Sequence, residues 1–138
     1  MTPGCQLTVT DAGALAAALQ GADTVFHCAQ PAYHRWSEEF PGLQRSVLDA
    51  AARAGVGVVV AVENLYPYGA VRGGPITEST PFNPCSRKGE VRARLATELA
   101  AAHTEGRMAT AAVRASDFVG PGVSGSAYGE RFVGPVVK

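Results

Sequence analysis

Three stretches of the chain carry the residue pattern of β-strands. Residues 56–62 are apolar at nearly every position, which indicates a strand covered on both faces, as in a parallel sheet flanked by helices. Residues 24–29 form a shorter segment of residues that favour β-strands, and residues 108–114 form a third such segment. The pattern therefore predicts three strands.

Helical periodicity occupies the intervals around these strands. Apolar residues recur every three or four positions in three segments, so that each segment has one apolar face. Pro41 and Gly42 obscure where the second helix begins, because proline lacks the backbone donor that a helix interior uses. The predicted helices follow Thr10 or Asp11 as far as Gly21, Ser37 as far as Gly55, and Arg87 to about His103.

The order of these elements predicts how they are connected. Strands that alternate with helices favour a parallel sheet joined by right-handed crossovers. Residues 63–86 contain prolines and glycines and form a long loop, a length that is often functional. Ligands of such sheets bind beyond the carboxyl ends of the strands. Those ends are His27, Cys28 and Ala29; Glu63 and Asn64; and Ala115 and Ser116.

Composition narrows the class of protein. A chain of 138 residues with 46% apolar and 17% charged residues suits one globular domain. Twelve basic residues balance twelve acidic ones without a basic run, which argues against a nucleic-acid surface. The longest apolar run is too short for a membrane span. The three cysteines lack metal-ligand spacing and Met1 opens no signal peptide, so we expect reduced thiols, no metal site and a cytoplasmic location.

Three segments resemble the extended short-chain dehydrogenases of the NAD-dependent epimerase/dehydratase family. ADTVFHCA at residues 22–29 resembles the family's GADxVFHxAA strand, and LYPYG at residues 65–69 resembles its xxVYG segment. Residues 113–122, from Val-Arg to Phe-Val-Gly-Pro-Gly, resemble its RPxNVYGPG loop. The resemblance implies a Rossmann-like fold and bound NAD or NADP.

The resemblance also marks what this chain lacks. The family opens with a strand, a G-x-x-G-x-x-G turn and a helix whose N-terminus holds the cofactor pyrophosphate. No such turn occurs here, and the chain begins near the family's third strand, at residues 7–10. Residues 1–138 are therefore expected to form a partial doubly wound sheet without its first βαβ unit or the family's C-terminal substrate lobe. For this chain alone we expect weak or absent binding of NAD or NADP.

The catalytic positions implied by the resemblance are altered. Family members use Ser or Thr with a Y-x-x-x-K pair, in which the lysine lowers the tyrosine pKa and holds the nicotinamide ribose. Lys88 is the corresponding lysine, but Pro84 stands at the tyrosine position and Asn64 at the Ser/Thr position. Tyr66 and Tyr68 are the nearest phenols that could replace the missing acid.

Each candidate residue also has a structural interpretation. Lys88 either points into the cleft or snorkels to solvent. Asn64 either bonds a substrate carbonyl or holds its own loop, and Tyr68 occupies a position usually explained by packing. His27 either lies beside the cofactor or is a structural histidine. The residues expected to contact the cofactor are His27, Cys28, Ala29, Lys88, Ala115 and Ser116.

The leading hypothesis is an NAD(P)-dependent epimerase, dehydratase or reductase acting on a small hydroxylated or nucleotide-linked substrate. A noncatalytic dinucleotide-binding or interaction module and an inactive truncated fragment are the alternatives.

Without the family's first strand, the strand at residues 24–29 would have a free apolar edge, which favours self-association.

Overall fold

A three-stranded parallel sheet forms the centre of the protein. The computed structural model describes residues 8–71 and 73–118. The strands are β1 (Thr24–His27), β2 (Val58–Asn64) and β3 (Ala109–Ala115), in the order β1-β2-β3. Both neighbouring pairs are parallel. The predicted partial Rossmann-like α/β fold is thereby confirmed.

Three α-helices and two short 3₁₀ helices accompany the strands; α1 precedes β1 and the others connect the strands. The α-helices are α1 (Ala12–Ala18), α2 (Trp36–Ala54) and α3 (Arg87–Thr104), and the 3₁₀ helices are η1 (Tyr33–Arg35) and η2 (Tyr66–Tyr68). Asp11 caps α1 by accepting hydrogen bonds from two backbone N–H groups of its first turn, because those groups have no partner inside the helix. The helix α2 begins at Trp36, directly after η1, and continues through Pro41.

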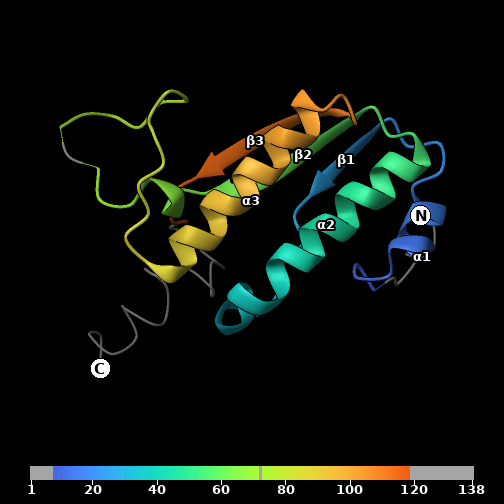
Figure 1. Ribbon diagram of the computed structural model, residues 1–138, viewed down its shortest axis with the longest axis horizontal. Helices are drawn as coiled ribbons and strands as arrows, with labels where there is room; N and C mark the ends of the chain where they lie inside the picture. The colour runs from blue at the N-terminus through green and yellow to red at the C-terminus, as the bar shows by residue number, and fades with distance from the viewer. Residues whose placement is uncertain (1–7, 72, 119–138) are drawn as a thin grey trace.

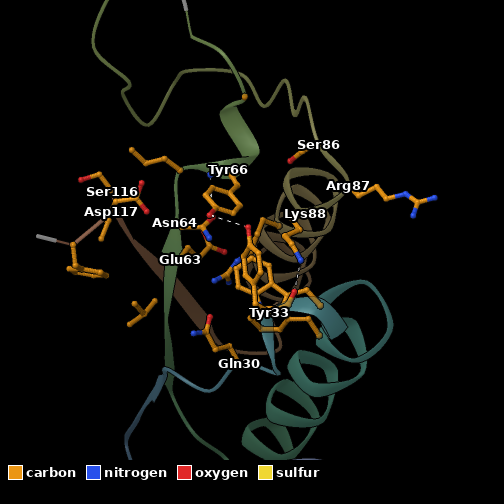
Figure 2. A pocket seen from close by; sticks show the side chains of 18 of the residues that line it. Gln30, Tyr33, Glu63, Asn64, Tyr66, Ser86, Arg87, Lys88, Ser116 and Asp117 are labelled. Carbon is orange, nitrogen blue, oxygen red and sulfur yellow. Dashed lines mark hydrogen bonds between the residues drawn. The ribbon is translucent and has the colours of Figure 1, made fainter. Parts of the chain in front are cut away.

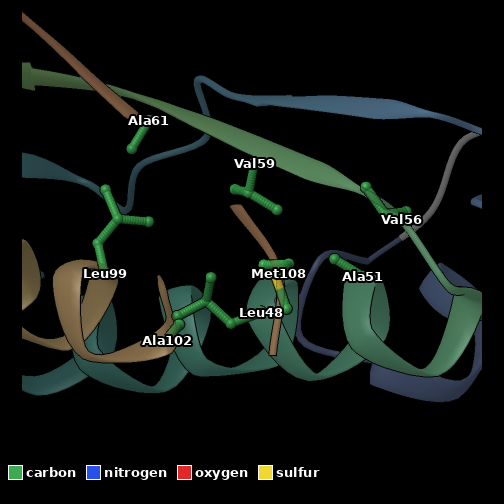
Figure 3. Close-up of a cluster of buried hydrophobic side chains, with 8 residues drawn as sticks. All are labelled: Leu48, Ala51, Val56, Val59, Ala61, Leu99, Ala102 and Met108. Carbon is green, nitrogen blue, oxygen red and sulfur yellow. The ribbon is translucent and has the colours of Figure 1, made fainter. Parts of the chain in front are cut away.

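The hydrophobic core lies between these helices and one face of the sheet. Figure 1 shows α2 and α3 side by side across that face, with α1 beside α2. Leu48 of α2, Val59 of β2 and Leu99 of α3 belong to one buried cluster, which Figure 3 shows. This cluster thus holds α2 and α3 against the central strand β2.

The opposite face of the sheet corrects one prediction. Residues 56–62 were expected to be covered on both sides, but only alternate side chains of β2 are buried. On the outer face Phe26 and Val113 are 69% and 57% exposed. The reason is that, among the described residues, α2 and α3 pack on one side of the sheet only. A continuous apolar run shows what a strand can bury, not what covers it.

Two segments of the family resemblance fall at the ends of the described residues. Thr8 to Thr10 form no strand: the carbonyl of Thr8 accepts a hydrogen bond from the N–H of Asp11 in a turn that leads into α1. The strand expected at residues 7–10 is therefore wrong for its described part, and Leu7 lies outside the described residues. Residues 119–122 of the glycine-containing loop also lie outside them.

Candidate functional site

A cavity of about 970 Å³ lies beyond the carboxyl ends of the strands. Ala29 after β1, Val62 on β2 and Ala115 on β3 line it together with Lys88 of α3. Parallel strands bring their carboxyl ends to one edge of the sheet, which is why residues far apart in sequence meet here. Of the two positions considered for Lys88, the structure has the one at the cleft. Figure 2 shows this cavity.

The N-terminus of α3 lies close against η2, and this contact positions Lys88. Ser86 caps the helix by accepting a hydrogen bond from the N–H of Gly89. Gly89 is buried, and a Cβ atom there would stand 2.7 Å from the carbonyl oxygen of Tyr66. Only glycine therefore allows this approach without a shift of the backbone. The close packing brings Lys88 and Tyr66 into the same cavity.

Lys88 contacts Tyr33, which the sequence analysis did not single out. The Lys88 ammonium donates a hydrogen bond to the Tyr33 carbonyl oxygen and lies 3.7 Å from the centroid of its ring. Because Lys88 lines the cavity and is half-buried, its charge is directed toward the site rather than fully to solvent. Tyr33 stacks edge-on against Trp36, and their ring centroids are 5.0 Å apart.

Two phenols meet at the cavity. The hydroxyl oxygens of Tyr33 and Tyr66 are 3.5 Å apart, a long hydrogen bond (Figure 2). This hydrogen bond, together with burial, raises the pKa of Tyr66 to about 12. At neutral pH Tyr66 therefore keeps its proton and can donate it. Of the two tyrosines proposed to replace the missing acid, Tyr66 is the one that lines the cavity.

Asn64 stands at the end of β2 and also lines the cavity. Its side-chain oxygen accepts a hydrogen bond of 3.2 Å from the N–H of Tyr66. This bond holds the start of η2, which is one of the two roles that the sequence analysis considered for Asn64. Its amide nitrogen donates no hydrogen bond among the described residues, so this group has donors that an oxygen-bearing ligand could use.

Two of the predicted site residues are not among the described residues that line the cavity. Tyr68 is buried: its hydroxyl accepts a hydrogen bond of 3.0 Å from Arg114, and its ring packs against Phe82. His27 is buried edge-on against Phe40, with ring centroids 6.5 Å apart. Burial, helped by the charge of Arg92, lowers the pKa of His27 to about 4, so His27 is neutral at pH 7.

The other residues expected to contact a cofactor do border the cavity. Cys28 and Ala29 follow β1, and Ala115 and Ser116 stand at the end of β3 and just beyond it. Both described cysteines, Cys28 and Cys85, are free and exposed, and both line the cavity. The structure thus gathers Cys28, Ala29, Asn64, Tyr66, Lys88, Ala115 and Ser116 around one space.

Two charged residues of the cavity wall were not assigned a role from the sequence: Glu63 was named only as a strand end, and Arg92 was not considered. Glu63 is buried at the end of β2, where the Nε atom of Arg114 donates a 2.7 Å hydrogen bond to its carboxylate. Burial raises the pKa of Glu63, and the charge of Arg114 opposes that effect. Arg92 lies one turn after Lys88 on α3 and is also buried. Helical spacing from Lys88 could have identified Arg92.

The described residues offer neither a metal centre nor a membrane-spanning helix. Within residues 8–71 and 73–118, no group of three or more His, Cys, Asp or Glu side chains is arranged to hold a metal ion. Over the same part of the chain, no helix combines the length and hydropathy that crossing a bilayer requires.

The chain is similar to proteins of one family. The sequence model of the "NAD dependent epimerase/dehydratase family" matches residues 2–138. A double mutant of dTDP-glucose 4,6-dehydratase from Streptomyces venezuelae, solved with NAD bound, has 29% sequence identity and a TM-score of 0.75 over 83% of this chain and 38% of that chain. No curated protein sequence matches significantly.

Two other solved structures share the fold. UDP-glucose 4-epimerase from Brucella ovis, in complex with NAD, is 22% identical, with a TM-score of 0.70 over 80% of this chain and 37% of that chain. UDP-N-acetylglucosamine 4-epimerase from Methanobrevibacter ruminantium M1 is 23% identical, with a TM-score of 0.75 over 91% and 43%. This chain therefore spans about two fifths of the length of these structures.

Proposed function

The chain belongs to the NAD-dependent epimerase/dehydratase family, and we propose that it serves NAD(P)-dependent epimerisation, dehydration or reduction of a sugar nucleotide or a similar hydroxylated substrate. One observation carries this proposal: Lys88, Asn64 and Tyr66 border a single cavity beyond the carboxyl ends of three parallel strands. In this proposal residues 1–138 are part of an NAD(P)-binding Rossmann-like domain.

The described residues suit the nicotinamide-ribose end of the cofactor. The Lys88 ammonium at the cavity is a donor for ribose hydroxyl groups, and the small side chains of Ala29 and Ala115 leave room beside the strand ends. No strand among the described residues leads into a G-x-x-G-x-x-G turn, so the fit concerns this end alone. When bound, NAD(P) supplies the acceptor and donor of hydride.

The residues of this chain would handle the substrate and its protons. Lys88 places a positive charge beside the ribose and the phenols. Tyr66, which keeps its proton at neutral pH because its pKa is about 12, acts as a proton donor to a substrate oxygen. Asn64 donates its amide N–H to the same or a neighbouring oxygen. Tyr68 and His27 are proposed to support the site by packing.

A noncatalytic dinucleotide-binding module is the second candidate. It is favoured by Pro84, which has no ionisable proton at the position of the family's tyrosine. It is also favoured by the raised pKa of Tyr66, because the phenol is then a weak acid and almost no phenolate is present at neutral pH to accept a proton. The two candidates share the same cavity and the same cofactor. They differ in the effect of Tyr66→Phe: the catalytic candidate predicts a change in turnover, and the binding module predicts a change in ligand affinity alone.

Binding of two nicotinamide ligands tests the proposal. NADH and reduced nicotinamide mononucleotide are titrated into the full chain, and their fluorescence is followed. We expect both to bind weakly, because the described residues suit the nicotinamide-ribose end alone. Lys88→Met should weaken each about tenfold, as loss of a charged hydrogen bond does. Arg94→Met is the matched control, because Arg94 is exposed on the same helix and paired with Glu98. Absence of binding by the folded chain would refute the proposal.

We also propose that copies of this chain associate through β1. This strand stands at the edge of the described sheet, next to β2 only, and Phe26 on it is largely exposed. Unpaired edge groups next to apolar side chains favour pairing with another strand. The cytoplasm is the proposed location, since both described cysteines carry free thiols.

A further inference from the structure

Arg92 is a buried cation in the wall of the cavity. It is 7% exposed and lines the cavity one turn after Lys88. Its guanidinium carbon lies 4.6 Å from the ring centroid of Trp36 and 4.5 Å from that of Phe40. Cation–π attraction to these rings stabilises the charge and holds the position of the guanidinium group. Arg92 also belongs to the cavity lining, so these two rings do not enclose it completely.

No anion of the described chain pairs with this guanidinium. Among residues 8–71 and 73–118, Arg92 forms no ion pair within 4.0 Å, and its buried Nε has no hydrogen-bond partner. The acidic residue at the same wall, Glu63, is bonded to Arg114 instead. A buried charge without a hydrogen-bonded partner lowers the stability of the folded state, and a bound anion would offset this effect.

The charges around the cavity leave a positive surplus. Arg87, Lys88 and Arg92 are the basic residues that line it, and Glu63 and Asp117 are the acidic ones. Arg114 offsets Glu63, and the buried His27 is neutral at pH 7. The described wall therefore has three basic side chains, while Asp117 is the one acidic side chain not offset by Arg114. A cavity with this balance attracts negatively charged ligands.

We propose that Arg92 binds an oxyanion of the ligand, a carboxylate or a phosphate group, at this wall of the cavity. The planar guanidinium presents N–H groups in a fork that matches two oxygens of such a group. The inference rests on the proposed function for the identity of the ligand, and it narrows the substrate class to molecules that bring an acidic group to Arg92. The anion would complete the pairing that the chain itself lacks.

Small probes test this site without the cofactor. The Nε–H resonance of Arg92 is assigned in the full chain and followed by nuclear magnetic resonance during titration with benzoate, with neutral benzamide and with inorganic phosphate. We expect benzoate or phosphate to shift the resonance and benzamide to leave it in place. A response to benzoate assigns the site to carboxylates, and a response to phosphate alone assigns it to phosphate groups.

Variants separate the charge from the fold. Arg92→Gln should weaken binding of the responding anion about tenfold or more, followed by backbone amide shifts. Arg92→Lys, which keeps the charge beside Trp36 and Phe40 but lacks the fork, should weaken it less. Arg94→Gln is the control and should change nothing. If the folded wild-type chain responds to neither anion, or if Arg92→Lys and Arg92→Gln both bind as wild type does, the inference is wrong.

The outcome is independent of the nicotinamide titration. Loss of anion binding in Arg92→Gln with unchanged binding of reduced nicotinamide mononucleotide supports the inference whatever the turnover. Nicotinamide binding without any anion response overturns the inference and leaves the proposed function intact.

Discussion

The Nε atom of Arg114 donates a 2.7 Å hydrogen bond to the carboxylate of Glu63, whose side chain is only 4% exposed. These residues face each other on β3 and β2, so the pair joins two strand ends beside the cavity. Arg114→Met would leave the buried carboxylate without its partner. We expect a loss of about 3 kcal/mol in the free energy of unfolding, measured by urea denaturation.

Arg107→Met is the matched control for this variant. Arg107 pairs with Asp49 at 2.6 Å, but both side chains are more than a third exposed, at 35% and 42%. The expected loss is below about 1 kcal/mol. The double variant Glu63→Gln, Arg114→Met should recover part of the loss, because it removes the unpaired charge. Equal losses for Arg107→Met and Arg114→Met would contradict the account.

Acid should destabilise the fold through His27. Its pKa falls from 6.5 to about 4 on folding, first because of burial and second because of Arg92. The unfolded chain therefore binds a proton more readily, and stability present above pH 6.5 is lost as the pH falls toward 4. The loss amounts to about 3 kcal/mol.

Urea denaturation at pH 7 and at pH 4.5 measures this effect. Other groups titrate in the same range, so the informative quantity is the difference between the wild type and His27→Gln. That variant should lose less stability on acidification, whereas His103→Gln, at an exposed position, should follow the wild type. The same pH dependence in wild type and His27→Gln would show that His27 titrates normally.

Substitution of Gly89 should loosen the site. A Cβ at this position would stand 2.7 Å from the Tyr66 carbonyl oxygen and 3.0 Å from Cβ of Pro84. Gly89→Ala must push α3 away from η2, and we expect a loss of about 1–3 kcal/mol in thermal unfolding. In Gly42→Ala the new Cβ meets nothing within 4 Å on α2, and a gain of about 0.5–1 kcal/mol is expected. Stabilisation by both variants would disprove the close approach.

A charge on the outer sheet face should reduce self-association. Phe26 is 69% exposed on β1, and Phe26→Lys places a charge on the edge strand without touching the buried face. We expect light scattering to show association of the wild type that decreases in this variant. Thr97→Lys, on the exposed side of α3, should associate as the wild type does. A monomeric wild type at high concentration would rule out the proposed association.

The fold followed from periodicity because each element carries its own pattern. Residues 56–62 and 108–114 were placed within two residues of β2 and β3. The start of α2 was less certain from the sequence because of Pro41 and Gly42. In the structure Trp36 follows η1 directly, and no side chain caps the helix. Whether one or both faces of the sheet are covered could not be inferred from β2 alone. The sequence of a strand does not show whether another element packs on its apolar side chains.

The site was only partly accessible from sequence. Lys88 and Asn64 were found because the family resemblance fixes their positions. Tyr33 was missed because η1 carries no motif, and its contact with Lys88 depends on how α2 packs against α3. Arg92 was missed because a charged residue in a helix is normally expected to face solvent, whereas Arg92 is buried on the face of α3 that packs in the core.

The central claim is that the ends of β1, β2 and β3 form one cofactor cavity with Lys88. Amide shifts of the full chain during titration with reduced nicotinamide mononucleotide test it most directly. The account predicts that the largest shifts fall together on Ala29, Asn64, Lys88 and Ala115, and that Phe26 and Val113 on the outer face stay unchanged. Shifts confined to the outer face, or to one strand end alone, would contradict it.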